Sequence, residues 1–151
     1  RASTRNCGLI FGAEDYARDL GLPVLRNRDA RELIFARSMI INAAAAARLQ
    51  SVDGVWPDLN DTEGLDRDAE QARNLGFTGK SLIHPAQIDA VNRAFRPTPE
   101  DVEFARAVVK AFEEGEERGL GAVAFGGQLL DRPIVDRAFA VLDAVEPSHA
   151  A

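Results

Sequence analysis

The segment spanning residues 8–21 constrains the fold of this chain more than any other feature. An apolar run at residues 9–11 predicts a short buried strand, and a Gly-Ala pair lets the backbone turn tightly after it. Glu14 and Asp15 therefore follow the carboxyl end of a strand, where α/β proteins place their chemistry. A strand-to-helix turn of this kind is suited to hold a metal ion at the mouth of a barrel.

Strand and helix patterns alternate as far as Arg96. We expect strands at residues 9–11, 50–56 and 78–83, and helices at residues 28–49, 62–75 and 85–95. Pro85 suits the first position of its helix, where a missing N–H costs nothing. The alanine run at residues 43–47 is interpreted as a tightly packed helix face. Alternation on this scale indicates parallel βαβ units.

The pattern changes after Arg96. Thr98 and Pro99 predict the start of an amphipathic helix over residues 100–118. Residues 121–130 predict a hairpin that turns at a Gly-Gly pair, and residues 133–145 a last helix. We therefore divide the chain into βα units at residues 1–96 and a helical appendage with a β-hairpin at residues 97–151. The appendage is expected to serve oligomerisation or to cap an active site.

Composition narrows the class of protein. The net charge is −6 and the basic residues are scattered, which argues against nucleic acid as a partner. A single cysteine excludes an internal disulfide framework, and no apolar run approaches the 18 residues of a transmembrane span. Residues 1–6 lack the apolar core of a signal peptide. These observations predict a cytoplasmic protein without a membrane partner.

Four short strings make the chain resemble one family. They are Gly-Ala-Glu-Asp at residues 12–15, Val-Asp-Gly-Val-Trp-Pro at 52–57, Gly-Phe-Thr-Gly-Lys at 76–80 with Ile-His-Pro-Ala-Gln at 83–87, and Gly-Gln-Leu-Leu-Asp-Arg-Pro at 127–133. In this order and spacing they resemble the citrate lyase beta-subunit-like group of the HpcH/HpaI aldolases, which includes citryl-CoA and malyl-CoA lyases. Family members form a complete TIM (β/α)8 barrel. The resemblance is to their C-terminal half, so it implies the C-terminal part of a barrel followed by the appendage.

The resemblance implies a Mg²⁺-dependent carbon–carbon lyase. Its substrate would be the CoA thioester of a hydroxy acid, split into acetyl-CoA and a keto acid. The family binds Mg²⁺ through one Glu and one Asp, and the motif match makes Asp15 the Asp ligand. The paired Glu and a substrate-binding Arg belong to a strand that this sequence does not contain. Glu14 is not assigned, because adjacent side chains at a strand end diverge. From the residues alone, a helix N-cap is the alternative for Asp15.

Asp131 is the expected catalytic residue. In relatives that resemble citramalyl-CoA and malyl-CoA lyases, an Asp of this C-terminal motif reaches the active site of a neighbouring subunit. It acts there as the acid or base at the thioester α-carbon. Asp131 also precedes an Arg-Pro pair that opens a helix, so capping is an equal alternative.

Further residues are expected around the substrate. Gly12 and Ala13 are predicted to bind it, as are Trp56 and Pro57 at the end of the second strand, with core packing the alternative for the last two. Lys80 and His84 flank the third strand, and His84 is expected at the barrel mouth or as a helix cap. Arg37 and Arg48 lie on a helix, where solvated or interface positions are expected.

The predicted sheet needs a partner surface. Three parallel strands leave apolar edges uncovered. The resemblance points to a homotrimer or homohexamer, and a companion chain that supplies the N-terminal half of the barrel is a further possibility. A truncated or noncatalytic assembly module that retains the lyase fold is the alternative to an enzyme. An upstream Glu and Arg, in the same gene or in a companion chain, distinguish the two.

Overall fold

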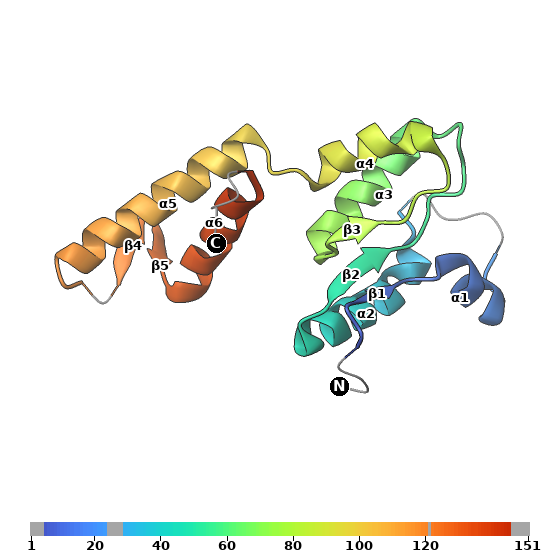
Figure 1. Cartoon of the computed structure of the whole chain (residues 1–151), viewed down its shortest axis with the longest axis horizontal. Helices are drawn as coiled ribbons and strands as arrows, with labels where there is room; N and C mark the ends of the chain where they lie inside the picture. The colour runs from blue at the N-terminus through green and yellow to red at the C-terminus, as the bar shows by residue number, and fades with distance from the viewer. Residues whose placement is uncertain (1–4, 24–28, 121, 146–151) are drawn as a thin grey trace. The chain divides into compact units, whose positions relative to one another are not determined.

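The computed structural model describes residues 5–23, 29–120 and 122–145. It divides the chain into two compact units, which we call the first unit (Arg1–Phe95) and the second unit (Arg96–Ala151). The first unit carries a parallel sheet, and the second pairs two helices with a hairpin (Figure 1). No helix in the described ranges combines the length and apolar character that a membrane crossing requires.

The sheet of the first unit consists of β1 (Gly8–Ile10), β2 (Gln50–Asp53) and β3 (Gly79–Lys80), parallel and in that order. Its register pairs Ile10 with Val52 and Asp53 with Lys80. The predicted parallel βαβ units are therefore confirmed. β2 and β3 are shorter than expected. β2 ends before Gly54, whose carbonyl accepts a hydrogen bond from the Lys80 ammonium.

Among its described residues, the first unit also contains four α-helices and two short 3₁₀ turns. They are α1 (Ala13–Asp19), η1 (Arg31–Leu33), α2 (Ile34–Ala47), α3 (Thr62–Leu75), η2 (Pro85–Gln87) and α4 (Ile88–Phe95). A helix was expected from Arg28, which lies outside the described residues. α2 begins later because Ala30 adopts a left-handed conformation at φ 45°, which interrupts a right-handed helix.

The alanine run lies at the carboxyl end of α2. Of residues 43–47 only Ala44 is buried, while Ala43, Ala45 and Ala46 are exposed. The expected tightly packed face is therefore wrong. Alanine has the highest intrinsic helix propensity, which suffices to place it on an exposed helical surface.

α3 has the predicted bounds because signals at both of its ends are strong. The Asp61 carboxylate accepts a hydrogen bond from Gly64 N at 2.8 Å, and Gly76 ends the helix at φ 106°. Inside, α3 and α4 share a core formed by Trp56, Leu65, Ala69 and Val91. A second core, formed by Phe11, Ala13, Ala30, Leu33 and Ala36, holds α1 and α2.

Gly64 is predicted to be the most constrained position of α3. A Cβ atom there would lie 2.1 Å from Asp61 Oδ2 and 2.4 Å from Trp56 Cζ2. We expect Gly64→Ala to lower the free energy of unfolding of the first unit by about 1–3 kcal/mol, the usual cost of overpacking. Urea unfolding followed by Trp56 fluorescence measures it. Gly79→Ala is the control, since nothing lies within 4 Å of its added Cβ; an equal loss in both variants would contradict the steric account.

The second unit is built on two long helices. α5 (Pro99–Glu117) begins with a capping box, in which Thr98 and Asp101 exchange hydrogen bonds, and it packs on α6 (Arg132–Val145). β4 (Val123–Phe125) and β5 (Gln128–Leu130) pair antiparallel. Gly126 and Gly127 connect them at φ 56° and 81°, a turn conformation that glycine favours. The predicted cap and turn are confirmed; Gly121, where the hairpin was expected to begin, lies outside the described residues.

Candidate active site at the strand ends

The turn after β1 places Asp15 inside a helix. Gly12 occupies the N-cap position of α1 and makes no side-chain cap hydrogen bond, and Tyr16 N donates to Gly12 O at 3.0 Å. Asp15 is therefore the third residue of α1, and its interpretation as an N-cap is wrong. The reason is that the flexible glycine takes the cap position, three residues before Asp15.

The Asp15 carboxylate is open to solvent. Its side chain is 76% exposed and its Oδ1 lies 2.9 Å from Arg18 Nη1, which belongs to a side chain that is 70% exposed. An ion pair this exposed contributes little stability, so a divalent cation can compete with the guanidinium. Asp15 also lies in the first turn of α1, where the helix dipole favours negative charge.

The carboxylate at the turn is of the ligand type that Mg²⁺ prefers. Mg²⁺ takes oxygen ligands, commonly one or two carboxylates with water and substrate oxygens completing the shell. Asp15 offers such an oxygen. Across residues 5–23, 29–120 and 122–145, no three His, Cys, Asp or Glu side chains gather into a metal-binding group. Metal binding by Asp15 remains a prediction, and it calls for further oxygen ligands beside this carboxylate.

The end of β2 lies directly against this turn. A Cβ atom on Gly54 would lie 2.7 Å from Ala13 Cβ and 3.1 Å from Phe11 O. Phe11 N also donates to Val52 O at 2.9 Å. The structure therefore brings the Gly-Ala turn and the residues after β2 together at one edge of the sheet, as parallel strands require.

Trp56 and Pro57 follow β2 but differ in their surroundings. Trp56 is 6% exposed, packs in the core between α3 and α4, and donates from Nε1 to Asp61 O at 3.1 Å. Pro57 beside it is exposed. The core-packing alternative thus describes where Trp56 lies in the first unit. Substrate contact remains a prediction for Gly12, Ala13, Trp56 and Pro57.

Four charged side chains are buried together behind the strand ends. We call Arg37, Asp53, Asp68 and Lys80 the buried charge cluster; counted over the whole residue, backbone included, they are 1%, 2%, 6% and 8% exposed. Asp53 and Lys80 are register partners at the ends of β2 and β3, while Arg37 comes from α2 and Asp68 from α3. Two positive charges face two negative charges, so the cluster is formally neutral. Burial of such charges requires this pairing.

Lys80 uses all three of its ammonium protons within the cluster. Nζ donates to Asp53 Oδ2 and Gly54 O, both at 2.8 Å, and to Asp68 Oδ2. An ammonium has three donors, so no proton remains for a ligand. Its side chain is 0% exposed. Lys80 therefore stabilises the strand ends, with its ammonium fully paired inside the cluster.

Arg37 is the second cation of the cluster and binds the Asp53 carboxylate together with Lys80. Nε and Nη2 bind the two oxygens of Asp53 at 3.0 and 2.6 Å, the bidentate geometry that arginine favours. Nη1 donates to Gln71 Oε1 and lies 3.3 Å from Asp68 Oδ1. Within the described residues, no buried side-chain nitrogen or oxygen lacks a hydrogen-bond partner.

The expectation of a solvated or interface position is wrong for Arg37, whereas Arg48 is exposed. Sequence reasoning missed the cluster, although a signal existed. Arg37 lies among Leu33, Ile34, Ile40 and Ile41 on the apolar side of its helix, where an unpaired charge would be costly. Its partners are 16 and 31 residues away along the chain, and only the packing of helices and strands brings them together.

His84 and Asp131 both lie at helix starts. His84 Nδ1 accepts a hydrogen bond from Ala86 N at 3.1 Å, which confirms its predicted role as a cap. Asp131 precedes α6, and its Oδ1 accepts from Ile134 N at 3.2 Å. The capping interaction of Asp131 is thus present, in the second unit and on an exposed side chain. Its acid or base role remains a prediction.

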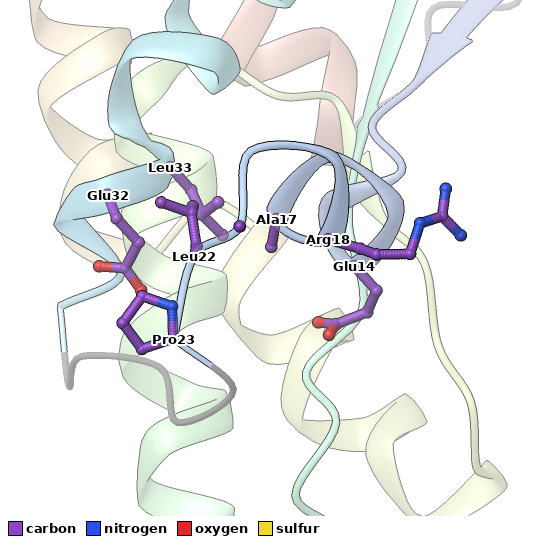
Figure 2. Close-up of a pocket in the computed structure, with 8 residues that line it drawn as sticks. Glu14, Ala17, Arg18, Leu22, Pro23, Glu32 and Leu33 are labelled. Atoms are coloured by element: carbon purple, nitrogen blue, oxygen red, sulfur yellow. The ribbon is translucent and has the colours of Figure 1, made fainter.

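A pocket of about 330 Å³ lies beside α1. Figure 2 shows an apolar centre formed by Ala17, Leu22 and Leu33, with carboxylates of Glu14 and Glu32 at its sides and Arg18 extending away. Gly21 and Pro23 complete the lining. Asp15 does not line this pocket, so the pocket and the expected metal ligand lie near one another but are not one site.

Comparisons with known proteins agree on one family. The model of the HpcH/HpaI aldolase/citrate lyase family matches residues 2–85. Citrate lyase subunit beta of Leuconostoc mesenteroides is 40% identical over 148 residues, 98% of this chain and 48% of its own. Mouse mitochondrial citramalyl-CoA lyase is 38% identical over 130 residues, 86% of this chain and 38% of its own.

Solved structures show the same likeness. The CitE protein of Mycobacterium tuberculosis, in complex with magnesium, acetoacetate and coenzyme A, superposes with a TM-score of 0.77 at 35% identity. The match covers 91% of this chain and 51% of that one. The chain therefore spans about half the length of the relatives that it matches.

Proposed function

Because the chain belongs to the HpcH/HpaI aldolase/citrate lyase family, we propose that it forms the C-terminal part of a (β/α)8-barrel lyase acting on CoA esters. The substrate is the CoA thioester of a hydroxy acid, of the citryl-CoA or malyl-CoA type, and the products are acetyl-CoA and a keto acid. The observation that carries the proposal is the 40% identity with a citrate lyase beta subunit across 98% of this chain. A CoA-bound structural neighbour supports a thioester substrate.

The proposed reaction breaks one carbon–carbon bond. The substrate hydroxyl loses its proton and becomes the keto oxygen of the released acid. The electron pair of the broken bond passes to the thioester α-carbon, which takes up a proton to give acetyl-CoA. The site must therefore stabilise negative charge on the oxygen and supply a proton at the carbon.

Asp15 is proposed to hold Mg²⁺ through its carboxylate. When bound, the ion polarises the oxygen that becomes the keto group. The position of Asp15 supports this role, because it lies beyond the carboxyl end of a parallel strand and its carboxylate reaches solvent. Further oxygen ligands, including the family's Glu, are expected from the part of the barrel that this chain does not contain.

Asp131 is proposed to exchange the proton at the thioester α-carbon. Exclusion of water in a closed site lets a carboxylate do this work. Its exposed position at the start of α6 leaves the side chain accessible to another surface. We propose that this surface is the strand-end edge of a neighbouring subunit, so that the second unit caps the site of a partner.

Assembly is supported by apolar side chains left open in the first unit. β1 is an edge strand, and Ile10 on it is 70% exposed, while Phe35 of α2 is 74% exposed. Exposed strand edges and apolar patches call for a covering surface. We propose that the remainder of the barrel covers β1 and that the protein assembles as a homotrimer or homohexamer.

A noncatalytic assembly module remains the second candidate. It is supported by the described residues, among which no three His, Cys, Asp or Glu side chains gather into a metal-binding group. Such a module would keep the buried charge cluster for folding. It would bind neither Mg²⁺ nor a CoA thioester, so binding measurements distinguish it from the enzyme.

Magnesium binding tests the assignment of Asp15. We expect Asp15→Asn, in the protein at its full natural length, to lower Mg²⁺ affinity at least about tenfold, because an amide is a far weaker ligand for a hard cation. The fold should persist, with a loss of at most about 1 kcal/mol from the helix dipole. Isothermal titration calorimetry measures the affinity. Glu14→Gln, which removes the adjacent charge, should bind as the wild type does. Equal affinity in Asp15→Asn, or a wild type that binds no Mg²⁺, would refute the assignment.

A further inference from the structure

We propose that Lys80 is a positioning residue that sets the place of the Gly12–Asp15 turn, acting through the backbone of Gly54. The final step, from the turn to Mg²⁺ at Asp15, rests on the proposed function. The earlier steps rest on contacts within the first unit alone.

The first step is the fixation of the chain after β2. The Lys80 ammonium binds Gly54 O at 2.8 Å and the Asp53 carboxylate at the same distance. Arg37 holds the other side of Asp53 with two hydrogen bonds. Residues 53 and 54 are thus held through both a side chain and a carbonyl in a buried, fully paired environment, which leaves them little freedom to shift.

The second step is the contact between Gly54 and the turn. An added Cβ on Gly54 would lie 2.7 Å from Ala13 Cβ and 3.5 Å from Ala13 N. Ala13 itself is 4% exposed. The first residue of α1 therefore packs directly against the backbone of Gly54. The absence of a side chain at Gly54 permits this close approach.

The third step leads from Ala13 to Asp15. Both belong to the first turn of α1, which Tyr16 N closes by donating to Gly12 O. The Asp15 side chain is 76% exposed, so its location depends on the backbone that carries it. A shift of Ala13 is therefore expected to move the carboxylate, and ligand sets tolerate only small displacements.

The test compares steric and electrostatic changes in the full-length protein. Gly54→Ala leaves every charge of the cluster intact but pushes on Ala13. Lys80→Met removes the hydrogen bond to Gly54 O. Two quantities are measured: Mg²⁺ affinity by calorimetry, and hydrogen exchange of the Tyr16 amide in metal-free protein. Both variants should lose about tenfold to a hundredfold in Mg²⁺ affinity, the usual effect of outer partners of metal ligands. Exchange at Tyr16 should accelerate.

A double variant, Gly54→Ala with Ala13→Gly, tests whether the effect of Gly54→Ala reaches Asp15 through Ala13. Ala13→Gly removes the nearest atom that Gly54→Ala would strike and leaves Phe11 O at 3.1 Å, so the double variant should bind Mg²⁺ within about threefold of Ala13→Gly alone. Leu65→Ala is the control for general destabilisation, because it opens a cavity in the core under α3 and does not touch the turn. It should leave both measured quantities unchanged.

The outcomes separate this inference from the proposed function. Wild-type Mg²⁺ affinity and unaltered Tyr16 exchange in Gly54→Ala would overturn the positioning role, whether or not Lys80→Met folds. A double variant that binds as weakly as Gly54→Ala would overturn the route through Ala13. A wild type that binds no Mg²⁺ would refute the proposed function, and Tyr16 exchange would still decide the positioning of the turn.

Discussion

Arg37→Met is expected to lower the free energy of unfolding of the first unit by about 3–5 kcal/mol, the usual cost of breaking a buried ion pair on one side. The substitution leaves Asp53 and Asp68 facing the single positive charge of Lys80, so one negative charge is buried without compensation. It also removes the guanidinium that lies 5.9 Å from the centre of the Phe77 ring. Urea unfolding followed by fluorescence measures the loss, because Trp56 is the single tryptophan of the chain and lies in the first unit.

Arg93→Met is the matched control for this prediction. Arg93 lies in the same unit and pairs with Asp66 at 3.6 Å, but the side chains are 68% and 54% exposed. Exposed ion pairs contribute about 0–1 kcal/mol, so this variant should unfold almost as the wild type does. If the two arginine variants lost equal stability, burial of the cluster would not be the source of the effect.

Asp131→Asn is expected to reduce turnover of a CoA thioester by about 100-fold to 10,000-fold, the range of general acid–base catalysis. Asparagine caps a helix about as well as aspartate, so the hydrogen bond to Ile134 N and the fold of the second unit should survive. Mg²⁺ affinity and assembly should not change. A spectroscopic assay of acetyl-CoA release measures turnover. Asp136→Asn, on α6 itself and paired with Arg132 at 2.8 Å, is the control and should remain active.

Mixed assemblies test whether Asp131 serves a neighbour. Asp15→Asn and Asp131→Asn subunits each lack one function. If sites are shared, some interfaces of a mixed oligomer pair an intact Asp15 with an intact Asp131, and activity should rise above that of either parent. Mass spectrometry confirms that mixed oligomers form. Mixed oligomers without recovered activity would leave Asp131 acting within its own chain or only capping α6.

The elements that could be predicted from the sequence are those whose ends carry local signals. α3 begins and ends where Asp61 and Gly76 indicate, since a carboxylate cap and a left-handed glycine act on their own neighbours. The hairpin turns at its glycine pair for the same reason. α2 was placed too early because nothing in the sequence marks Ala30 as left-handed; alanine rarely adopts that conformation.

The site could be predicted only in part. The turn carrying Asp15 follows a strand as expected, but the alternative interpretation of Asp15 as the N-cap was wrong, because a glycine at the cap position gives no side-chain signal. The buried charge cluster depends on long-range register, which sequence patterns do not fix. Arg37, Asp53 and Lys80 each look ordinary in their own segments; the β2–β3 register joins Asp53 with Lys80, and the packing of α2 on the sheet brings Arg37 to them.

The most direct test of the central claim is cleavage of citryl-CoA and malyl-CoA by the full-length protein, with Mg²⁺ supplied or removed by a chelator. The account predicts that the wild type releases acetyl-CoA and a keto acid from at least one of these thioesters, that chelation abolishes the release, and that Asp15→Asn stays inactive at Mg²⁺ concentrations that restore the wild type. Release that persists without Mg²⁺ or in Asp15→Asn, or no release from either thioester, would contradict it.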